Sequence, residues 1–375
     1  MGEINAWGGM GATLNKMKPY LAMLSLQFGY AGMYIVTLLS FKRGFSHWIF
    51  VVYRHAVATL AFAPFAFFLE KKIRPKMTKS IFFKIAVLAF LEPVLDQNLY
   101  GVGIQYTSAT FAAASVNVLP AVTFIMAVIF RMEKVNLKKI HSIAKVTGTL
   151  ITVTGAMVMT LYKGPVLGIF SGGGHHSAAG STADQHWVSG TIMMLSCIVG
   201  WAAFFILQNK TLNEYPAPLS LTSLICIMGT LEGGVVALVM ERHKSAWIIG
   251  FDSRLLACVY SGIVCSGIAY YLQSIVNKVK GPVFVTAFSP LSMIITAILS
   301  AIILGEQVHL GSLIGAVIIV SGLYSVVWGK SKENKERALA YDEGKAQELP
   351  VVDSEVIQID VSPMTNDKKA QNPEP

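Results

Sequence analysis

The chain has 375 residues, of which 54% are hydrophobic and only 14% are charged. Soluble domains carry about 25% charged residues, so this composition excludes an ordinary water-soluble enzyme. The formal net charge is +9, but the basic residues form short clusters between long apolar runs, as residues that flank membrane spans do. No zinc-type cysteine spacing or other nucleic-acid module accompanies them, and we expect no nucleic-acid partner.

Ten stretches of the sequence are long and apolar enough to cross a membrane, which takes about 20 mostly apolar residues. Backbone polar groups in lipid must be satisfied internally, so only helices and closed barrels can span, and barrel strands are only about ten residues long. We therefore predict an all-α integral membrane protein. The ten expected transmembrane helices cover about residues 19–41, 46–69, 80–103, 109–130, 140–162, 188–208, 219–240, 253–276, 282–304 and 310–329.

The basic residues between the expected helices predict the orientation of the chain. With the N-terminus in the cytoplasm, the inner loops hold the basic clusters at 71–79 and 131–139, although the first outer loop contains the pair Lys42-Arg43. This bias predicts that both termini are cytoplasmic. It also places the glycosylation sequon Asn209-Lys210-Thr211 on the cytoplasmic side, where it stays unmodified.

The cysteines and the loop histidines both have a simple structural interpretation. The cysteines lie inside apolar runs and not in the loops of a small secreted domain, so we expect them to be free. Residues 164–187 form an expected outer loop whose histidine pair His175-His176, with His186, could bind a metal. A solvated loop is the simpler interpretation, and we expect no metal and no cofactor. The cysteines are Cys197, Cys226, Cys258 and Cys265.

The two halves of the chain resemble each other at a nearly constant spacing. The residues that recur in order are Leu24-Ser25 with Leu195-Ser196, Gly29-Tyr30 with Gly200-Trp201, Pro120 with Pro290, Gly148 with Gly315, and Gly155 with Gly322. Each half holds five expected helices, and because this number is odd, the second half enters from the opposite side. The chain is thus predicted to contain two inverted five-helix repeats, which is a transporter architecture with the substrate at the repeat interface. The predicted parts are a cytoplasmic segment 1–18, repeats at 19–163 and 188–330, the outer loop 164–187, and a disordered cytoplasmic tail 331–375.

Several local motifs resemble those of plant EamA-like proteins. In the first half they are Ser25–Gly32, Leu91–Pro93, Asp96–Tyr100, Tyr106–Phe111, Asn117–Pro120, Arg131–Val135 and Lys163–Pro165; in the second they are Gly281–Phe288, Leu304–Glu306 and Gly322–Lys330. Over about residues 18–332 the chain is similar to the walls-are-thin-related family, also called nodulin-type or UMAMIT, within the drug/metabolite transporter superfamily. The resemblance implies ten helices and bidirectional, broad-range amino-acid transport, usually at the plasma membrane. Some relatives sit in the vacuolar membrane, and one is associated with auxin.

Ionisable residues inside membrane spans are costly and are candidate functional groups. Arg54, next to His55, and Asp96 lie at similar depth on neighbouring antiparallel helices, and Glu92 lies one α-helical turn from Asp96 on the same face. One interpretation is a buried ion pair of Arg54 with Asp96 or Glu92 that holds the two helices together. The other gives these groups a part in substrate charge recognition or proton coupling.

A broad-range amino-acid site needs donors for the carboxylate, acceptors for the ammonium group and a tolerant pocket for the side chain. Pro120 and Pro290 are candidate helix breaks, because proline removes a backbone donor and frees the carbonyl four positions earlier, here of Val116 and Thr286. Our candidate cavity residues could equally make helix–helix hydrogen bonds. They are Gln27, Tyr30, Gln97, Asn98, Asn117, Gln273, Thr286 and Ser289.

Other residues are expected to hold helices together. The recurring glycines of the two halves are spaced by seven, so each pair lies on one helix face and predicts close helix packing. The pair Gly305-Glu306, and Arg131 with Glu133-Lys134, stand at expected helix ends. They predict contacts that cap or lock these ends, with gating as the alternative.

The predicted function is transmembrane transport of small organic solutes by alternating access, with amino acids as the first candidates and auxin or another small organic acid as the alternative. A membrane enzyme would want an activated nucleophile, and no G-x-S-x-G, H-E-x-x-H or P-loop motif is present. A receptor would want a sizeable outer domain, and a sugar-nucleotide carrier several cavity bases, where Arg54 is nearly alone. The expected partners are a small-molecule substrate and the lipid bilayer; the oligomeric state does not follow from the sequence.

Overall fold

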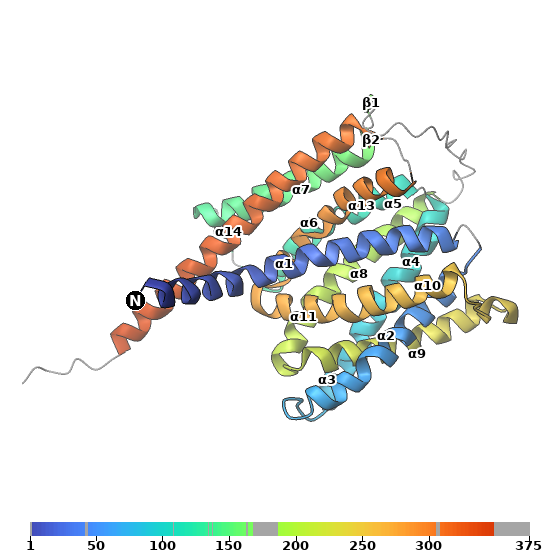
Figure 1. The fold of residues 1–375 in the computed structure, drawn as a ribbon, viewed down its shortest axis with the longest axis horizontal. Helices are drawn as coiled ribbons and strands as arrows, with labels where there is room; N and C mark the ends of the chain where they lie inside the picture. Colours follow the sequence, from blue (N-terminus) through green and yellow to red (C-terminus); the bar gives the residue numbers. More distant parts are fainter. Residues whose placement is uncertain are drawn as a thin grey trace, which may run out of the picture. The chain divides into compact units, whose positions relative to one another are not determined.

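The computed structural model describes residues 2–41, 44–107, 109–133, 135–136, 138–162, 164–167, 187–304 and 308–348, and these are almost entirely helical (Figure 1). The first half contains α1 (Gly2–Phe41), α2 (His47–Leu69), α3 (Lys79–Ala89), the π-helix η1 (Phe90–Asp96), α4 (Gln97–Tyr106), α5 (Ala109–Val116), α6 (Leu119–Ile129) and α7 (Ile140–Leu161). The second half contains α8 (Trp187–Glu214), α9 (Pro218–Met240), the 3₁₀ turn η3 (Lys244–Trp247), α10 (Ser253–Tyr260), the π-helix η4 (Ser261–Ile268), α11 (Ala269–Lys280), α12 (Pro282–Ala287), α13 (Ser289–Leu304) and α14 (Leu310–Glu348).

Eight helical stretches of the described chain are long and apolar enough to cross a membrane. Each has at least 22 residues, which exceeds the roughly 20 residues that a bilayer core requires. They coincide with eight of the predicted spans and establish an all-helical, multi-pass membrane protein. The stretches are Met17–Leu38, His47–Leu69, Ile140–Leu161, Val188–Glu214, Pro218–Met240, Ser253–Lys280, Pro282–Ile303 and Leu310–Glu336.

The two remaining predicted spans, 80–103 and 109–130, do not meet the same measure of length and hydropathy. The first falls on α3, η1 and α4, which continue one another but carry the acids Glu92 and Asp96 in their middle. The second is divided by a turn at Asn117-Val118 into the two short helices α5 and α6. The first stretch thus falls short because of the acids in its middle, and the second because the turn leaves two short helices.

The outer surface of α9 shows how the sequence fits a helix to lipid. Leu231, Val235 and Leu238 recur on one face and are each more than 60% exposed, whereas Gly229 and Gly233 face the opposite way. A side chain at Gly229 would press into Pro93 of η1, so this small-residue face lets neighbouring helices approach. Apolar residues outside and small or polar residues inside suit a helix whose solvent is lipid.

Two irregularities occur at corresponding places in the two halves. The π-helix η1 joins α3 to α4, and the π-helix η4 joins α10 to α11. The chain also leaves the helix at Asn117-Val118, just before Pro120, and at Phe288, just before Pro290. A π-helix accommodates one more residue per hydrogen-bonded turn and often marks a functional site.

α7 and α14 lie side by side with their backbones in contact (Figure 1). A Cβ atom added at Gly148 would stand 2.8 Å from the carbonyl oxygen of Gly322, and one added at Gly155 would stand 2.7 Å from the backbone nitrogen of Ile319. No side chain fits at such distances. The predicted close packing at the recurring glycines is therefore confirmed, and it follows the small-residue rule of membrane helix pairs.

Two segments outside the expected spans differ from expectation: the C-terminal segment and the start of the outer loop. α14 continues to Glu348, although a disordered tail was predicted from residue 331. Residues 331–348 are rich in Lys, Glu, Ala and Arg, which are good helix formers, so the helix has no local signal to stop. β1 (Val166–Leu167) pairs antiparallel with β2 (Val308–His309) at the start of the expected outer loop. The histidines of that loop, Lys134, Lys163, Gly305-Glu306 and residues 349–375 lie outside the described residues.

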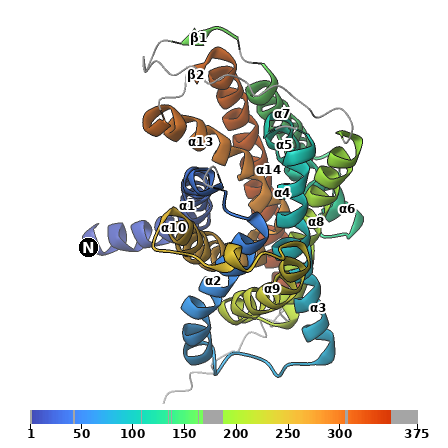
Figure 2. The same cartoon turned by 90° about the vertical axis from the view of Figure 1, so that its right-hand side faces the viewer.

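The helices that carry the predicted polar residues face one another. α2 packs along α9, while α8 packs against α4 and α6 (Figure 2). α2 also packs against η4. A Cβ atom added at Gly262 of η4 would stand only 2.6 Å from the carbonyl oxygen of Arg54, so η4 lies directly on the backbone of α2. Between α11 and α12, Gly281 adopts a φ of +85°, which glycine tolerates far better than other residues.

Candidate functional site

Arg54 of α2 is buried and turns its guanidinium toward two other helices. Its Nε donates to Oγ of Ser266 in η4 at 2.7 Å, and its Nη1 donates to Oε1 of Gln97 in α4 at 3.4 Å. Within the described chain, no carboxylate oxygen lies within 4.0 Å of its nitrogens. The predicted ion pair of Arg54 with Asp96 or Glu92 is therefore wrong, and a hydroxyl and an amide take the place of the acids.

Gln97 connects Arg54 to Glu92. Its Nε2 donates to Oε1 of Glu92, five positions earlier, at 3.2 Å. Neighbours on an α-helix face are three or four residues apart, but a π-helix aligns residues five apart, so η1 brings Gln97 over Glu92. The second oxygen of Glu92, Oε2, is buried and has no hydrogen-bond partner among the described residues.

Asp96, the other acid of η1, makes its hydrogen bond to another helix. The Sγ of Cys197 on α8 donates to Oδ1 of Asp96 at 2.7 Å, so this acid faces α8. Residues four apart stay on one side of a π-helix as they do of an α-helix, so the expectation that Glu92 and Asp96 share a face stays a prediction. The four cysteines are free and buried, as predicted.

His55, Ser266 and Tyr270 extend the polar contacts around Arg54. Nδ1 of His55 donates to the carbonyl oxygen of Val51 at 2.8 Å, since a carbonyl can only accept. Its Nε2 lies 3.4 Å from the Tyr270 hydroxyl and 3.5 Å from Oγ of Ser266. The Tyr270 hydroxyl also accepts from Nε2 of Gln97 at 3.5 Å. We call these connected groups the central polar network: Arg54, His55, Glu92, Gln97, Ser266 and Tyr270.

Two further predicted residues meet across α1 and α11. Nε2 of Gln273 donates to the hydroxyl of Tyr30 at 2.9 Å, and both side chains come from the predicted set. Gln273 follows Tyr270 by about one turn on α11, and Gln27 precedes Tyr30 by about one turn on α1, where it is buried. Gln273 thus lies about one turn from Tyr270 of the central polar network, and its hydrogen bond to Tyr30 links α11 to α1.

The remaining predicted residues make hydrogen bonds elsewhere. Asn98 and Thr286 donate to backbone carbonyls four positions earlier, at 2.7 and 3.1 Å, and the carbonyl of Ser289 accepts from a serine one turn later. Asn117 donates from Nδ2 to Oγ1 of Thr160 on α7 at 3.5 Å. Within the described residues, none of these bonds reaches the central polar network. Only Asn98 keeps a buried atom, Oδ1, without a partner.

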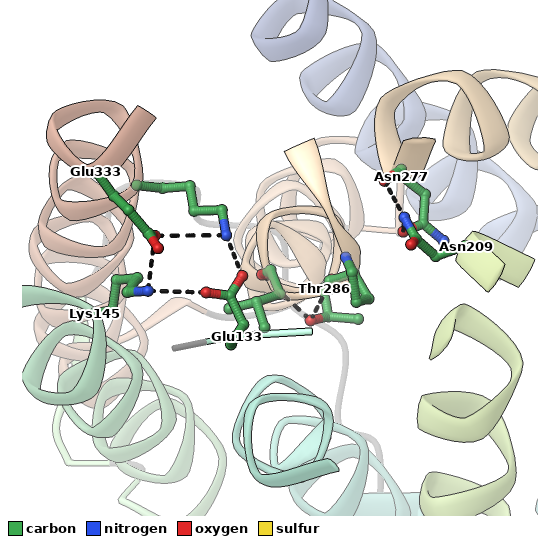
Figure 3. A network of polar contacts seen from close by, with 9 residues as sticks. Glu133, Lys145, Asn209, Asn277, Thr286 and Glu333 are labelled. Atoms are coloured by element: carbon green, nitrogen blue, oxygen red, sulfur yellow. Dashed lines mark hydrogen bonds and ion pairs between the residues drawn. The ribbon is translucent and has the colours of Figure 1, made fainter. Parts of the chain in front are cut away.

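A separate group of charges, which we call the buried ion cluster, joins α7, α14 and the segment after α6 (Figure 3). Nζ of Lys145 lies 2.8 Å from Oε2 of Glu133 and 2.8 Å from Oε2 of Glu333. Lys330 pairs with Glu133 and lies 3.7 Å from Oε2 of Glu333. The prediction that Glu133 holds helix ends together is confirmed. Buried ion pairs are tolerated when every charge has a partner, as here.

Lys145, Ser266 and Tyr270 were missed by sequence reasoning, although each carried a signal. Lys145 lies within the predicted span 140–162 and is an intramembrane charge as unusual as Arg54. Ser266, Tyr270 and Gln273 are spaced i, i+4 and i+7, which places them on one helix face. A polar stripe of this kind was readable, but Gln273 alone was selected from it.

Known proteins that are similar to this chain include a family of membrane transporters. The EamA-like transporter family matches this chain twice, over residues 17–161 and 188–328. The WAT1-related protein At1g21890 of Arabidopsis thaliana is 57% identical over 350 residues, which cover 90% of this chain and 89% of that protein. The WAT1-related protein At1g44800 of the same plant is 58% identical over 344 residues, covering 91% and 93%. A solved crystal structure, similar at a TM-score of 0.60 and 14% identity over 84% of this chain and 98% of that one, shares the fold.

The matched segments hold every residue of the central polar network and most of the chain. Multi-pass helices, a polar centre and this family together describe a protein that moves small solutes across a membrane. The chain belongs to the EamA-like transporter family, and its relatives in Arabidopsis thaliana are WAT1-related proteins.

Proposed function

We propose that this protein transports amino acids in both directions by alternating access, as a facilitator without a cofactor. An amino acid is a zwitterion, so its site must offer a positive group to the carboxylate and a negative group to the ammonium. Both groups must be in reach without neutralising each other. The central polar network has this property.

The observation that carries the proposal is the amide placed between a buried cation and a buried carboxylate. Arg54 hydrogen bonds Gln97, and Gln97 hydrogen bonds Oε1 of Glu92. Oε2 of Glu92 is left without a partner in the described chain. A substrate ammonium group supplies the missing donor, and a substrate carboxylate supplies the missing anion beside Arg54. Buried polar atoms without partners are costly, so a ligand that satisfies both is favoured.

Auxin and other simple organic acids are the second candidates, and they fit half of this arrangement. Such a molecule presents a carboxylate to Arg54 but brings no ammonium group to Glu92. Glu92 would keep its unpartnered oxygen, which costs binding free energy. The network therefore favours a zwitterion over an anion of similar size.

We further propose ten transmembrane helices in two inverted five-helix repeats, at 19–163 and 188–330. The two matches to one family support this arrangement, as does the recurrence of a π-helix and of a break before proline in each half. The network draws on both proposed repeats, through α2, η1 and α4 from one and η4 and α11 from the other. Rocking of one repeat against the other would open a buried site of this kind to each side in turn.

The proposed orientation has both termini in the cytoplasm and the plasma membrane as the site of action, with the vacuolar membrane as the alternative. We expect Asn209, in the sequon Asn209-Lys210-Thr211, to carry no glycan. Its Nδ2 already donates to the carbonyl oxygen of Asn277 at 2.6 Å (Figure 3). When the protein is purified from plant cells, glycosidase treatment should leave its gel mobility unchanged. Mass spectrometry of the untreated protein should find Asn209 without a glycan. A glycan on Asn209 would reverse the proposed orientation.

The substrate class is tested by flux in cells that express the protein. Labelled glutamine should enter and leave faster than in control cells, at two external pH values, while labelled auxin moves at the control rate. Unlabelled amino acids with different side chains should reduce the flux of labelled glutamine by competition, because the network is proposed to bind the carboxylate and ammonium groups that all amino acids share. Auxin movement without glutamine movement would assign the protein to organic acids instead.

A further inference from the structure

The loop between α2 and α3 forms a basic pocket at one membrane face. Lys71, Arg74 and Lys76 line it, together with Met77, Tyr215 and Leu224, around a volume of about 390 Å³. Two more bases, Lys72 and Lys79, lie in the same short segment. Clusters of this size next to the cytoplasmic end of a transmembrane helix attract anionic lipids. Basic residues at this face also set the orientation of a membrane protein. A ligand site must therefore show features that orientation alone does not explain.

The first such feature is that the neighbouring acids interact with other groups and not with the bases of the pocket. Glu70 immediately precedes the pocket, but its two oxygens accept from the backbone N–H groups of Leu219 and Ser220, at 3.0 and 2.6 Å, at the start of α9. Glu214 forms an ion pair with Lys84 of α3. Both acids are thus bound elsewhere. In the described chain, no carboxylate lies within 4.0 Å of the three pocket bases.

The second feature is Tyr215, whose side chain is fully buried while it lines the pocket. Its hydroxyl makes no hydrogen bond within 3.5 Å among the described residues, and the Ser220 side chain is a polar neighbour. Burial raises the pKa of Tyr215, so the hydroxyl keeps its proton. A buried donor without a close acceptor costs free energy, and a phosphate oxygen in the adjoining pocket would compete with Ser220 for this hydroxyl.

The third feature is the apolar surface beside the pocket. Phe67, Phe68 and Leu69 end α2 and are each more than half exposed, and Phe82 and Phe83 begin the exposed face of α3. The guanidinium of Arg74 lies 5.8 Å from the centre of the Phe67 ring. The bases therefore adjoin surface that suits acyl chains, and the pocket stands at the boundary between headgroups and hydrocarbon.

We propose that this pocket binds the headgroup of an anionic phospholipid that carries a phosphate monoester, of the phosphoinositide kind. Three unpaired cations suit a group with more than one negative charge better than a phosphodiester with a single charge. The tyrosine hydroxyl adds a neutral donor to the phosphate. The proposed orientation puts the pocket in the cytoplasmic leaflet, where anionic lipids are concentrated.

The test is a lipid titration of the purified full-length protein, followed by native mass spectrometry. Short-chain phosphatidylinositol 4-phosphate should bind at least tenfold more tightly than phosphatidylserine or phosphatidylcholine. The triple variant Lys71→Gln/Arg74→Gln/Lys76→Gln should lose at least tenfold in affinity. The matched control Lys138→Gln/Lys278→Gln/Lys332→Gln removes three bases from the same proposed face and should bind as the wild type does.

Equal weakening in the two triple variants, or equal binding of phosphatidylserine, would show diffuse charge and overturn the proposal. Tyr215→Phe removes only the hydroxyl, so it should weaken phosphoinositide binding about threefold without changing the melting temperature; this variant decides the matter if the triple variant misfolds. Soluble inositol 1,4-bisphosphate should bind at least tenfold more weakly than the lipid. Equal binding of this soluble headgroup would assign the pocket to a soluble phosphate and not to a membrane lipid.

Discussion

Replacing Arg54 with glutamine should lower amino-acid flux about 100-fold while the amount of protein in the membrane stays within a factor of two. A hydrogen bond to a charged group contributes up to about 3 kcal/mol, and each 1.4 kcal/mol is about tenfold in affinity. Arg54→Gln takes the positive charge away from the substrate carboxylate. It breaks no direct hydrogen bond to a buried acid, because Arg54 donates to a hydroxyl and an amide in this structure.

The measurement is glutamine flux divided by the membrane abundance of the protein, compared between Arg54→Gln and Arg242→Gln. Arg242 is an exposed arginine after α9 and serves as the matched control, with wild-type flux expected. A parallel fall of flux and abundance in Arg54→Gln would return Arg54 to a purely structural role. Unchanged flux would remove it from the substrate site.

Replacing Gly148 with alanine should destabilise the protein by about 3 kcal/mol, which lowers the melting temperature in detergent by about 5–10 °C. The new Cβ would stand 2.8 Å from the carbonyl oxygen of Gly322 and 2.8 Å from the backbone nitrogen of Val326. Both are backbone atoms of α14, which cannot move aside as the end of a flexible side chain can. α7 and α14 must then separate.

Gly234→Ala is the control for that experiment, because a Cβ atom there has nothing within 4 Å. Alanine is favoured over glycine inside a helix by about 1 kcal/mol, so Gly234→Ala should match or exceed the wild-type melting temperature. The two variants make the same chemical change in two helices and differ only in what surrounds it. Equal melting temperatures would mean that the backbones of α7 and α14 are not in contact at Gly148.

Much of the fold was readable from the sequence because lipid imposes simple rules. Stripes such as Leu231, Val235 and Leu238 mark a lipid-facing helix side, and long apolar runs predict the spans on which the structure agrees. Spaced glycines predict close packing for a steric reason that needs no partner to be known. The break before each of Pro120 and Pro290 follows from the chemistry of proline alone.

The pairing inside the site was not readable, because it depends on the direction in which each side chain points around its helix axis. Counting residues from the helix ends predicted that Arg54 and Asp96 lie at a similar depth in the membrane. The spacing of an α-helix predicted that Glu92 and Asp96 lie on one face. The π-helix η1 adds one residue to the turn, which brings Gln97 beside Glu92, and Gln97 with Ser266 contacts Arg54. No residue in the segment announces a π-helix. The candidate set therefore included Gln97, Tyr30 and Gln273, which make contacts between helices, but it did not identify the partners of Arg54.

The buried ion cluster has an electrical consequence. Its four members, Glu133, Lys145, Lys330 and Glu333, carry two positive and two negative charges, so their formal charges cancel. A membrane voltage does work of about 2.3 kcal/mol on each net elementary charge moved across 100 mV. A group of these four charges that moves as one body feels almost none of that work. The junction between α7 and α14 can thus shift or stay without the membrane potential favouring either position.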